Sequence, residues 1–324
     1  MAQLEQLNNI YSKVLFEIES FSYEDPQNKK LASAAANGLT IALSDIHPLN
    51  HSALFPVERL KQGNPSFFKT KPEKTFLSSG TSQTTRSKSV FSRDGLFLYK
   101  VTAISSFIAM LEKTNITRGR FAGISLIPTS ETWPNSSLAQ MLTWFSEYFE
   151  VRFIKESASG CELQSIIQAS KGPTWVFGTA FHFINMLDSM DKPNNSIGDL
   201  FVFETGGTKG LSREVSRKQL YLELNAKLGV SLNNIASEYG MSELSSQAWS
   251  FRNPNYKNNS HEAPYEFPNH VKLSVTRFEA EKHCHGNGSL IIEDPLRVDL
   301  PYAIRVQDIV NLSKSGSFEI LGRV

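Results

Sequence analysis

The sequence is poor in cysteine, carries almost no net charge and has no long uninterrupted apolar run. Its two cysteines, Cys161 and Cys284, are too few for a disulfide framework in a chain of 324 residues, which favours a reducing compartment. The 33 Lys and Arg side chains nearly balance the 32 Asp and Glu side chains, for a formal charge of +1. Because no net positive field would attract a polyanion, we expect no nucleic-acid partner.

Membrane-targeting features are scarce as well. Residues 1–7 have neither a basic region nor an apolar core, so no secretory signal is predicted. The most apolar helical stretch, residues 101–111, contains hydroxyl side chains and is shorter than the ~20 residues that span a bilayer. We therefore expect a cytoplasmic protein without a membrane span. The Walker A pattern G-x-x-x-x-G-K-[ST] does not occur either, which excludes P-loop kinases and ATPases.

What is present is the composition of a folded chain, with 40% hydrophobic and 20% charged residues. Segments typical of strands alternate with segments typical of helices through the middle of the sequence. The predicted strands are residues 75–77, 121–128, 151–154, 174–177, 200–203 and 232–236. The predicted helices are residues 94–111, 134–149, 161–169, 180–187 and 213–228. This alternation predicts an α/β fold in which helices flank mainly parallel sheets.

The two ends of the chain have other patterns. Helical spacing of apolar residues predicts helices over residues 4–18 and 30–43. After about residue 252, short β-type segments follow at residues 271–275, 290–292, 309–310 and 318–321. We therefore expect an N-terminal helical segment packed on the core over residues 1–74, an α/β core over residues 75–252, and a smaller β-rich C-terminal subdomain over residues 253–324.

A hydroxyl-rich segment follows the predicted strand at residues 75–77. It reads Ser-Ser-Gly-Thr-Ser-Gln-Thr-Thr-Arg-Ser-Lys over residues 78–88. Hydroxyl and backbone N–H groups on a turn that glycine permits can wrap phosphate oxygens, and Arg86 or Lys88 could add positive charge. A solvated Ser/Thr loop is the alternative that composition alone leaves open.

Two further turns follow predicted strands. The first, Glu-Tyr-Gly-Met-Ser-Glu-Leu over residues 238–244, offers a ring that can stack on a base and a carboxylate that can hold a divalent cation. Ligands of parallel sheets bind at the carboxyl ends of strands, so its position suits a site. A helix-capping turn with Ser242 as N-cap is the alternative. The second turn, Glu-Thr-Gly-Gly over residues 204–207, permits close approach to a flat ligand or forms a plain tight turn.

In their order and spacing, these three segments resemble the adenylate-forming superfamily of acyl-CoA synthetases, luciferases and peptide-synthetase adenylation domains. Residues 78–82 are similar to its phosphate-loop motif [ST]-S-G-T-T-G-x-P-K. Residues 239–243 are similar to its Y-G-x-T-E motif. Gly206 and Gly207 stand where the family has the glycine pair that lines the adenine and acyl pocket.

The resemblance continues over about residues 75–323. Residues 174–179 fall where the family has the strand and turn that open the acyl site, residues 306–308 resemble its T-G-D segment, and residues 321–323 resemble its G-R hinge motif. The string Glu-Tyr-Gly-Met-Ser-Glu-Leu-Ser-Ser-Gln over residues 238–247 is closer to one branch, the acyl-protein synthetase (LuxE) family of the fatty-acid reductase complex.

This resemblance implies an ATP-dependent and Mg²⁺-dependent ligase that converts a carboxylic acid, a fatty acid in the LuxE branch, to acyl-adenylate and pyrophosphate. The acyl group would then pass to a thiol acceptor, which a partner protein could carry. A carboxylate is already ionised at neutral pH, so this attack on phosphorus needs no general base. The fold implied is the large N-terminal domain of these enzymes, which makes residues 75–252 an adenylate-binding core.

Roles follow from the resemblance residue by residue. Thr81, Ser242 and Glu243 would be catalytic, with Glu243 also the Mg²⁺ ligand, because charge builds on phosphate oxygens during the attack. The nucleotide-binding residues would be Ser78, Ser79, Gly80, Ser82, Thr84, Gly206, Gly207, Tyr239, Gly240, Asp308 and Arg323.

The sequence also departs from the family pattern. The phosphate-loop motif has Gln83 and Arg86 where the family shows Gly and Lys. The chain ends at Val324, directly after the hinge motif, so we expect the mobile C-terminal domain to be absent. These departures leave a second hypothesis, a catalytically degenerate adenylate-binding or acyl-binding subunit of a larger complex. Outside the motifs, we expect Cys161 to be a buried small hydrophobe and His182 to be satisfied in the core.

Overall fold

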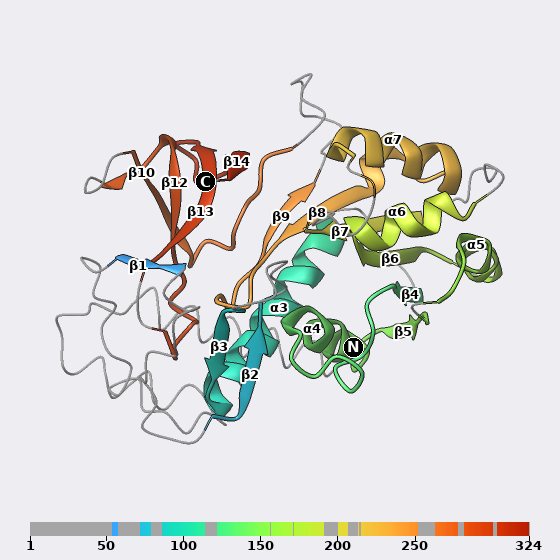
Figure 1. Cartoon of the computed structure of the whole chain (residues 1–324), viewed down its shortest axis with the longest axis horizontal. Helices are drawn as coiled ribbons and strands as arrows, with labels where there is room; N and C mark the ends of the chain where they lie inside the picture. The colour runs from blue at the N-terminus through green and yellow to red at the C-terminus, as the bar shows by residue number, and fades with distance from the viewer. Residues whose placement is uncertain are drawn as a thin grey trace. The chain divides into compact units, whose positions relative to one another are not determined.

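The computed structural model describes residues 54–57, 72–78, 86–113, 122–155, 157–170, 172–190, 200–206, 213, 215–251, 263–277, 282–300 and 303–323. The helices expected over residues 4–18 and 30–43 lie outside this part of the chain. The chain divides into two compact units (Figure 1). The first unit comprises Met1–Phe107, Met241–Gln247 and Glu266–Val324, and the second comprises Ile108–Gly240 and Ala248–Tyr265.

The second unit is built on a six-stranded sheet in the order β5-β4-β6-β7-β8-β9. The first five strands are parallel, and β9 pairs antiparallel with β8 at the edge. The strands are β4 (Ala122–Ser125), β5 (Glu150–Phe153), β6 (Thr174–Thr179), β7 (Leu200–Thr205), β8 (Ile235–Tyr239) and β9 (Ala248–Phe251). The predicted mainly parallel sheet is confirmed.

A hydroxyl N-cap residue directly precedes each of four helices in the second unit. The helices are α4 (Ser137–Phe145), α5 (Gly160–Ala169), α6 (Ala180–Asp188) and α7 (Arg217–Leu228). Their N-cap side chains, Ser136, Ser159, Thr179 and Ser216, each accept a backbone N–H from three residues further on. These caps explain why α4 and α7 begin later than residues 134 and 213. A short 3₁₀ turn, η3 (Leu232–Asn234), likewise delays β8 to Ile235.

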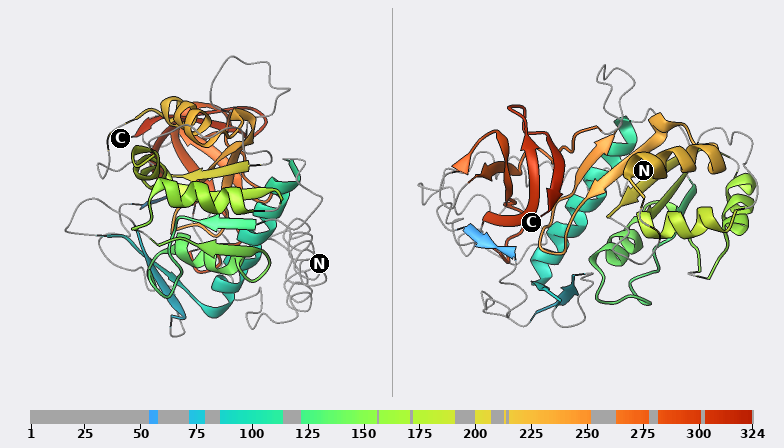
Figure 2. Two further views of the ribbon diagram at one scale, coloured as in Figure 1. Left: turned by 90° about the vertical axis from the view of Figure 1, so that its right-hand side faces the viewer. Right: turned by 45° about the horizontal axis from the view of Figure 1, so that its top comes forward.

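The two faces of this sheet bury different side chains. On one face, aliphatic residues of the strands, such as Val176 and Val202, belong to one core cluster with apolar residues of α5, α6 and α7. Figure 2 shows α6 and α7 lying along the same face. On the other face Trp175 contacts Phe149, which follows α4, and Phe203, with ring centroids 6.3 and 6.5 Å apart. Alternation along each strand produces these two layers.

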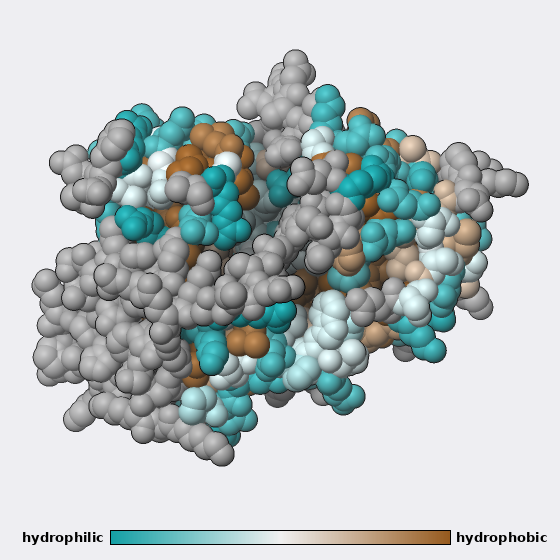
Figure 3. Space-filling model, viewed as in Figure 1, coloured by the Kyte–Doolittle hydropathy of each residue, from teal (hydrophilic) through white to brown (hydrophobic). Residues whose placement is uncertain are grey.

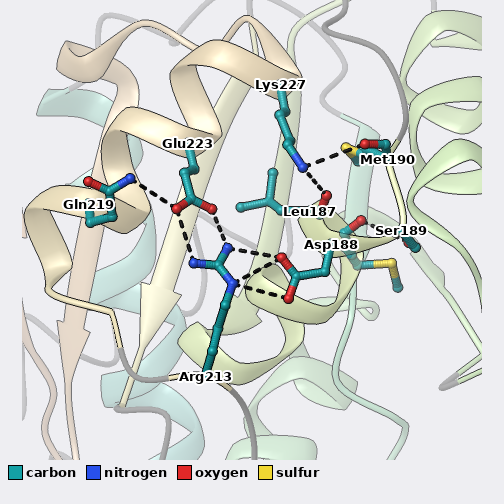
Figure 4. Close-up of polar contacts among 9 residues, drawn as sticks. Leu187, Asp188, Ser189, Met190, Arg213, Gln219, Glu223 and Lys227 are labelled. Carbon is teal, nitrogen blue, oxygen red and sulfur yellow. Dashed lines mark hydrogen bonds and ion pairs between the residues drawn. The ribbon is translucent and has the colours of Figure 1, made fainter.

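Polar contacts join α6, α7 and the segment that precedes α7 (Figure 4). Arg213 donates from Nε to Asp188 at the end of α6 at 3.0 Å and also binds Glu223 of α7. Lys227 of α7 donates to the carbonyl oxygen of Leu187. The carboxylates of Glu223 and Asp188 hold the pKa of Arg213 above its usual range. Arg213 is exposed, so this cluster contributes little stability.

The first unit contains a second six-stranded sheet, in the order β1-β13-β12-β10-β11 with β14 also paired to β13. Strand β1 pairs parallel with β13, and the other pairs are antiparallel. The strands are β1 (Leu54–Pro56), β10 (Lys272–Thr276), β11 (Lys282–His283), β12 (Gly286–Glu293), β13 (Ala303–Leu312) and β14 (Phe318–Arg323). The predicted β-rich C-terminal region is confirmed, and β1 is an addition that no sequence pattern predicted.

A hairpin of β2 (Lys74–Leu77) and β3 (Lys88–Phe91) precedes the long helix α3 (Arg93–Lys113). Helix α3 has 21 residues, and its most apolar 18-residue window has a mean hydropathy of 1.4, so its length and composition would allow it to cross a membrane. It is longer than the apolar stretch at residues 101–111. Its most apolar window is 72% buried inside the protein, which is also what a core helix shows.

The described part of the surface is mixed in character. On the face displayed in Figure 3, hydrophilic residues are interspersed with smaller hydrophobic areas. Among the described residues, Leu222 and Leu321 are the large hydrophobic side chains that are exposed. Isolated exposed apolar side chains of this kind are ordinary on folded proteins.

Candidate functional site

The predicted site residues are distributed over both units and partly outside the described chain. Those outside are Ser79, Gly80, Thr81, Ser82, Thr84 and Gly207. Those in the first unit are Ser78, Ser242, Glu243, Asp308 and Arg323. Those in the second unit are Gly206, Tyr239 and Gly240.

The base of the hydroxyl-rich loop is closed by a pair of serines. The backbone N–H of Ser78 donates to the carbonyl oxygen of Ser87 at 3.0 Å. In return, the backbone N–H of Ser87 donates to Ser78 Oγ at 3.0 Å. The loop therefore leaves β2 and enters β3 at a fixed point, and the Ser78 hydroxyl still has its own hydrogen to donate.

The carboxylate of Glu243 lies buried beside this loop base. Its side chain accepts a hydrogen bond at Oε1 from Ser87 Oγ at 2.6 Å and one at Oε2 from Ser242 Oγ at 3.0 Å. Glu243 is 4% exposed and Ser242 is 6% exposed. No helix follows this turn, so the alternative of Ser242 as a helix N-cap is wrong. The first unit therefore brings Glu243 and Ser242 together with Ser87, at the end of the hydroxyl-rich loop.

The turn that carries Glu243 is held by a buried aspartate from another segment. Asp294 Oδ2 accepts the backbone N–H groups of Ser245 and Ser246 at 2.9 and 2.8 Å. Its Oδ1 accepts from Ser246 Oγ at 3.0 Å and from the backbone N–H of Leu296 at 3.2 Å. Asp294 is one of the side chains that sequence reasoning missed, since nothing local marks it as an anchor for residues 245–246.

A buried arginine adds positive charge to the same region. Arg297 stacks on the ring of Phe91 at 3.7 Å and donates to the carbonyl oxygen of Val90 at 2.7 Å and to Asp299 at 3.2 Å. Burial lowers the pKa of Arg297 to about 10, while the charges of Asp299, Asp294 and Glu243 oppose the shift. Arg297 is therefore a cation held among carboxylates that include the predicted metal ligand.

Glu243 is chemically suited to Mg²⁺. This ion prefers oxygen ligands and is commonly held by one or two carboxylates together with phosphate oxygens and water. Each oxygen of Glu243 accepts one hydroxyl hydrogen and keeps a further lone pair. No group of three or more His, Cys, Asp or Glu side chains that could hold a metal occurs among the described residues. A cation here would therefore depend on phosphate oxygens and water for the rest of its coordination.

Asp308 and Arg323 are neighbours on paired strands. They are Cα partners in the β13–β14 ladder, and Arg323 Nε lies 3.9 Å from Asp308 Oδ1. The side chain of Asp308 is 18% exposed and that of Arg323 is 68% exposed. The two residues that the resemblance implies for ribose binding are therefore adjacent and accessible.

In the second unit, the predicted residues follow the carboxyl ends of β7 and β8. Gly206 has a left-handed backbone (φ 67°), and a side chain there would meet no atom within 4 Å. Tyr239 ends β8 and is nearly buried, with its ring centroid 5.7 Å from that of Tyr265. Gly240 is exposed. The turns after β7 and β8 therefore have open glycine backbone, while the ring of Tyr239 is buried against Tyr265.

Two buried carboxylates under these turns were not predicted as functional. Glu204 accepts from the hydroxyl of Tyr221 at 3.3 Å and lies 3.8 Å from Arg217 Nε. Glu238 accepts from the hydroxyl of Thr205. Burial, reinforced by the charge of Glu204, raises the pKa of Glu238 to about 7. The sequence signal that could have identified each of them was a glutamate within an otherwise apolar strand.

Glu238→Gln is expected to change how stability depends on pH. The folded Glu238 carboxyl keeps its proton up to about pH 7, whereas the unfolded one loses it near 4.5. The contribution of the protonated Glu238 carboxyl to the free energy of unfolding is therefore fully present below about pH 4.5. It is lost as the pH rises through 7. In urea unfolding, the variant should gain up to about 3 kcal/mol over the wild type across this interval. Parallel pH profiles for the two proteins would contradict the assignment.

Two side-chain expectations need correction. Cys161 is exposed rather than buried, because the first turn of α5 presents it outward, and its Sγ lies 3.9 Å from the carbonyl oxygen of Ser189. His182 is buried but only half satisfied. Its Nδ1 pairs with Thr179 Oγ1 at 2.6 Å, while Nε2 has no hydrogen-bond partner in the part of the chain that the structure describes. Burial lowers the pKa of His182 to about 4, so the ring is neutral at pH 7.

The fold is that of the large N-terminal domain of adenylate-forming enzymes, as comparison with solved structures shows. O-succinylbenzoate coenzyme A synthetase from Bacillus subtilis, in complex with AMP, matches with a TM-score of 0.52 and 14% identity over 78% of this chain and 50% of that chain. The N-terminal domain of FACL13 from Mycobacterium tuberculosis matches with a TM-score of 0.54 and 15% identity over 78% and 62%. The luciferase-like enzyme of the mealworm Zophobas morio matches with a TM-score of 0.53 and 14% identity over 81% and 61%.

These similarities establish the fold, and the expected fold class is confirmed. The chain spans between 50% and 62% of the length of these three structures. No protein-family model and no curated protein sequence matches the chain.

Proposed function

We propose that the protein is an ATP-dependent ligase that converts a carboxylic acid to an acyl-adenylate and pyrophosphate. The observation that carries this proposal is the buried Glu243 carboxylate, bonded to the serine that ends the hydroxyl-rich loop. Support comes from the fold, because the Bacillus subtilis synthetase of the same fold has been crystallised with AMP and with ATP and a magnesium ion. ATP and Mg²⁺ are therefore the proposed cosubstrate and metal.

The proposed roles of the chain's residues in this reaction are as follows. The hydroxyl-rich loop, with Ser79, Thr81 and Ser82, donates hydrogen bonds to the departing pyrophosphate, and Ser242 does so to the α-phosphate. Glu243 holds Mg²⁺, which, when bound, offsets negative charge on the phosphate oxygens. The remaining nucleotide-binding residues border the base and ribose: Gly206, Gly207, Tyr239, Gly240, Asp308 and Arg323.

The proposed reaction has two steps. An oxygen of the acid's carboxylate attacks the α-phosphorus of ATP, the bond from that phosphorus to the bridging oxygen breaks, and pyrophosphate leaves. A thiolate then attacks the acyl carbon of the mixed anhydride, and AMP leaves with the bonding electrons. No oxidant or reductant is required.

The resemblance of residues 238–247 to the acyl-protein synthetase branch supports finer assignments. We propose a fatty acid as the substrate and a protein thiol as the acceptor, in a cytoplasmic enzyme. Gln83 and Arg86, which depart from the family pattern, favour a second candidate, a subunit that binds an adenylate or an acyl group without turnover.

Carboxylate-dependent exchange of labelled pyrophosphate into ATP separates the two candidates. The purified full chain, with Mg²⁺ and a long-chain fatty acid, should incorporate label, and mixtures without the acid or without Mg²⁺ should not. Parallel equilibrium dialysis with labelled ATP measures nucleotide binding. Nucleotide binding without exchange, for long-chain, short-chain and aromatic acids alike, would support the binding subunit and contradict the ligase.

A further inference from the structure

Resting on the proposed role of Glu243, we propose that Ser87 is a positioning residue that orients this carboxylate for the cation. The Ser87 hydroxyl donates to Glu243 Oε1 at 2.6 Å, across 156 residues of sequence and in a buried setting. Ser87 is 3% exposed. Short hydrogen bonds from a hydroxyl to a carboxylate are among the stronger ones in proteins.

The position of this hydroxyl is set by backbone contacts. Ser87 exchanges two hydrogen bonds with Ser78, one through its N–H and one through its carbonyl oxygen. The next residues enter β3, where Val90 accepts a hydrogen bond from the buried Arg297. The Ser87 Oγ atom therefore projects from a backbone that is anchored on both sides.

The two hydroxyl donors of Glu243 differ in what they can fix. Ser242 is the residue next to Glu243, so its bond moves with the turn and constrains the carboxylate only locally. Ser87 belongs to a different segment and fixes Oε1 relative to the base of the hydroxyl-rich loop. Without Ser87, rotation of the carboxylate about its terminal torsion would meet little resistance, because that torsion is broad.

A metal ligand held in one orientation binds its ion more tightly than one that must be ordered on binding. Partners that orient metal ligands typically contribute ten- to a hundredfold in metal affinity. Through Ser87, the same bond connects the loop proposed to hold phosphate with the ligand proposed to hold the cation. We therefore expect loss of the Ser87 hydroxyl to weaken the cation site.

Burial alone would not give Ser87 this role, and a neighbouring residue provides the comparison. Ser89 lies two residues after Ser87, in β3, is 2% exposed, and its Oγ has no hydrogen-bond partner among the described residues. Ser89→Ala therefore removes a buried hydroxyl two residues away without removing a bond to Glu243. It is the matched control for Ser87→Ala.

The test is Mn²⁺ binding to the full chain in the presence of a non-hydrolysable ATP analogue, followed by electron paramagnetic resonance of free Mn²⁺. Ser87→Ala should weaken Mn²⁺ binding by about tenfold or more, Ser89→Ala should bind as the wild type does, and Ser87→Thr should restore most of the affinity. Thermal unfolding without metal checks that each variant is folded. Should Ser87→Ala fail to fold, Ser87→Cys, nearly isosteric but a weak donor, takes its place and should also bind weakly.

Two results would overturn the inference, and they are distinguishable. Wild-type Mn²⁺ affinity in Ser87→Ala, alongside loss of binding in Glu243→Gln, would leave Glu243 as the ligand and remove Ser87 from its positioning role. Unchanged affinity in both variants would contradict the metal assignment in the proposed function itself.

Discussion

Glu243→Ala is expected to lower carboxylate-dependent pyrophosphate exchange by about a hundred- to a thousandfold. Glu243 contributes the carboxylate that would hold Mg²⁺ against the phosphate groups, and loss of a metal ligand removes charge stabilisation worth several kcal/mol in the transition state. The loss should be largest at limiting Mg²⁺, because a weakened site can be partly refilled by a high concentration of the ion. The measurement is the exchange rate as a function of Mg²⁺ concentration.

Two controls separate this effect from damage to the fold. Glu243→Gln keeps the shape of the side chain and an oxygen acceptor for the serine hydroxyls but removes the charge, so it should also lose exchange while remaining folded. Glu162→Gln neutralises an exposed carboxylate in the first turn of α5 and should exchange at the wild-type rate. Wild-type exchange by Glu243→Ala at limiting Mg²⁺ would remove Glu243 from the metal site.

Asp294→Ala is expected to lower the free energy of unfolding by about 3–5 kcal/mol. The side chain is 3% exposed and accepts four hydrogen bonds, three of them from backbone N–H groups. Its removal leaves those donors buried without acceptors, at about 1–3 kcal/mol each before relaxation. It also removes negative charge near the buried Arg297. Urea unfolding measures the loss.

An exposed aspartate at the end of α6 gives the comparison for this prediction. Asp188 also binds an arginine, Arg213, but its side chain is 49% exposed. Asp188→Ala should therefore cost no more than about 1 kcal/mol. Asp294→Asn keeps one side-chain oxygen and should fall between the two alanine variants. A loss for Asp294→Ala no greater than that for Asp188→Ala would mean that Asp294 does not anchor residues 245–246.

Segments whose signals are local could be predicted from sequence. Strand β6 and helix α6 were expected within two residues of their bounds, because a continuous apolar run precedes an amphipathic one. Thr179, at the junction, is also the N-cap of α6. Predicted helix boundaries were wrong where several hydroxyl residues could serve as the N-cap. Helix α7 begins after Ser216, four residues later than predicted. Strand β1 was missed because three residues acquire strand geometry only by pairing with β13.

The candidate site likewise has features that local sequence predicts and features that depend on long-range contacts. The sequence alone determined which residue types stand at the ends of β7 and β8, since strand, glycine turn and carboxylate follow one another directly in the chain. Only the tertiary structure decided that Ser87 bonds to Glu243 and that Asp294 holds the turn behind it, because these contacts join residues 156 and 48 or 49 positions apart. It also decided that Glu238 is buried and keeps its proton up to about pH 7. Burial and distant pairing depend on how separate segments pack, and local sequence does not encode that packing.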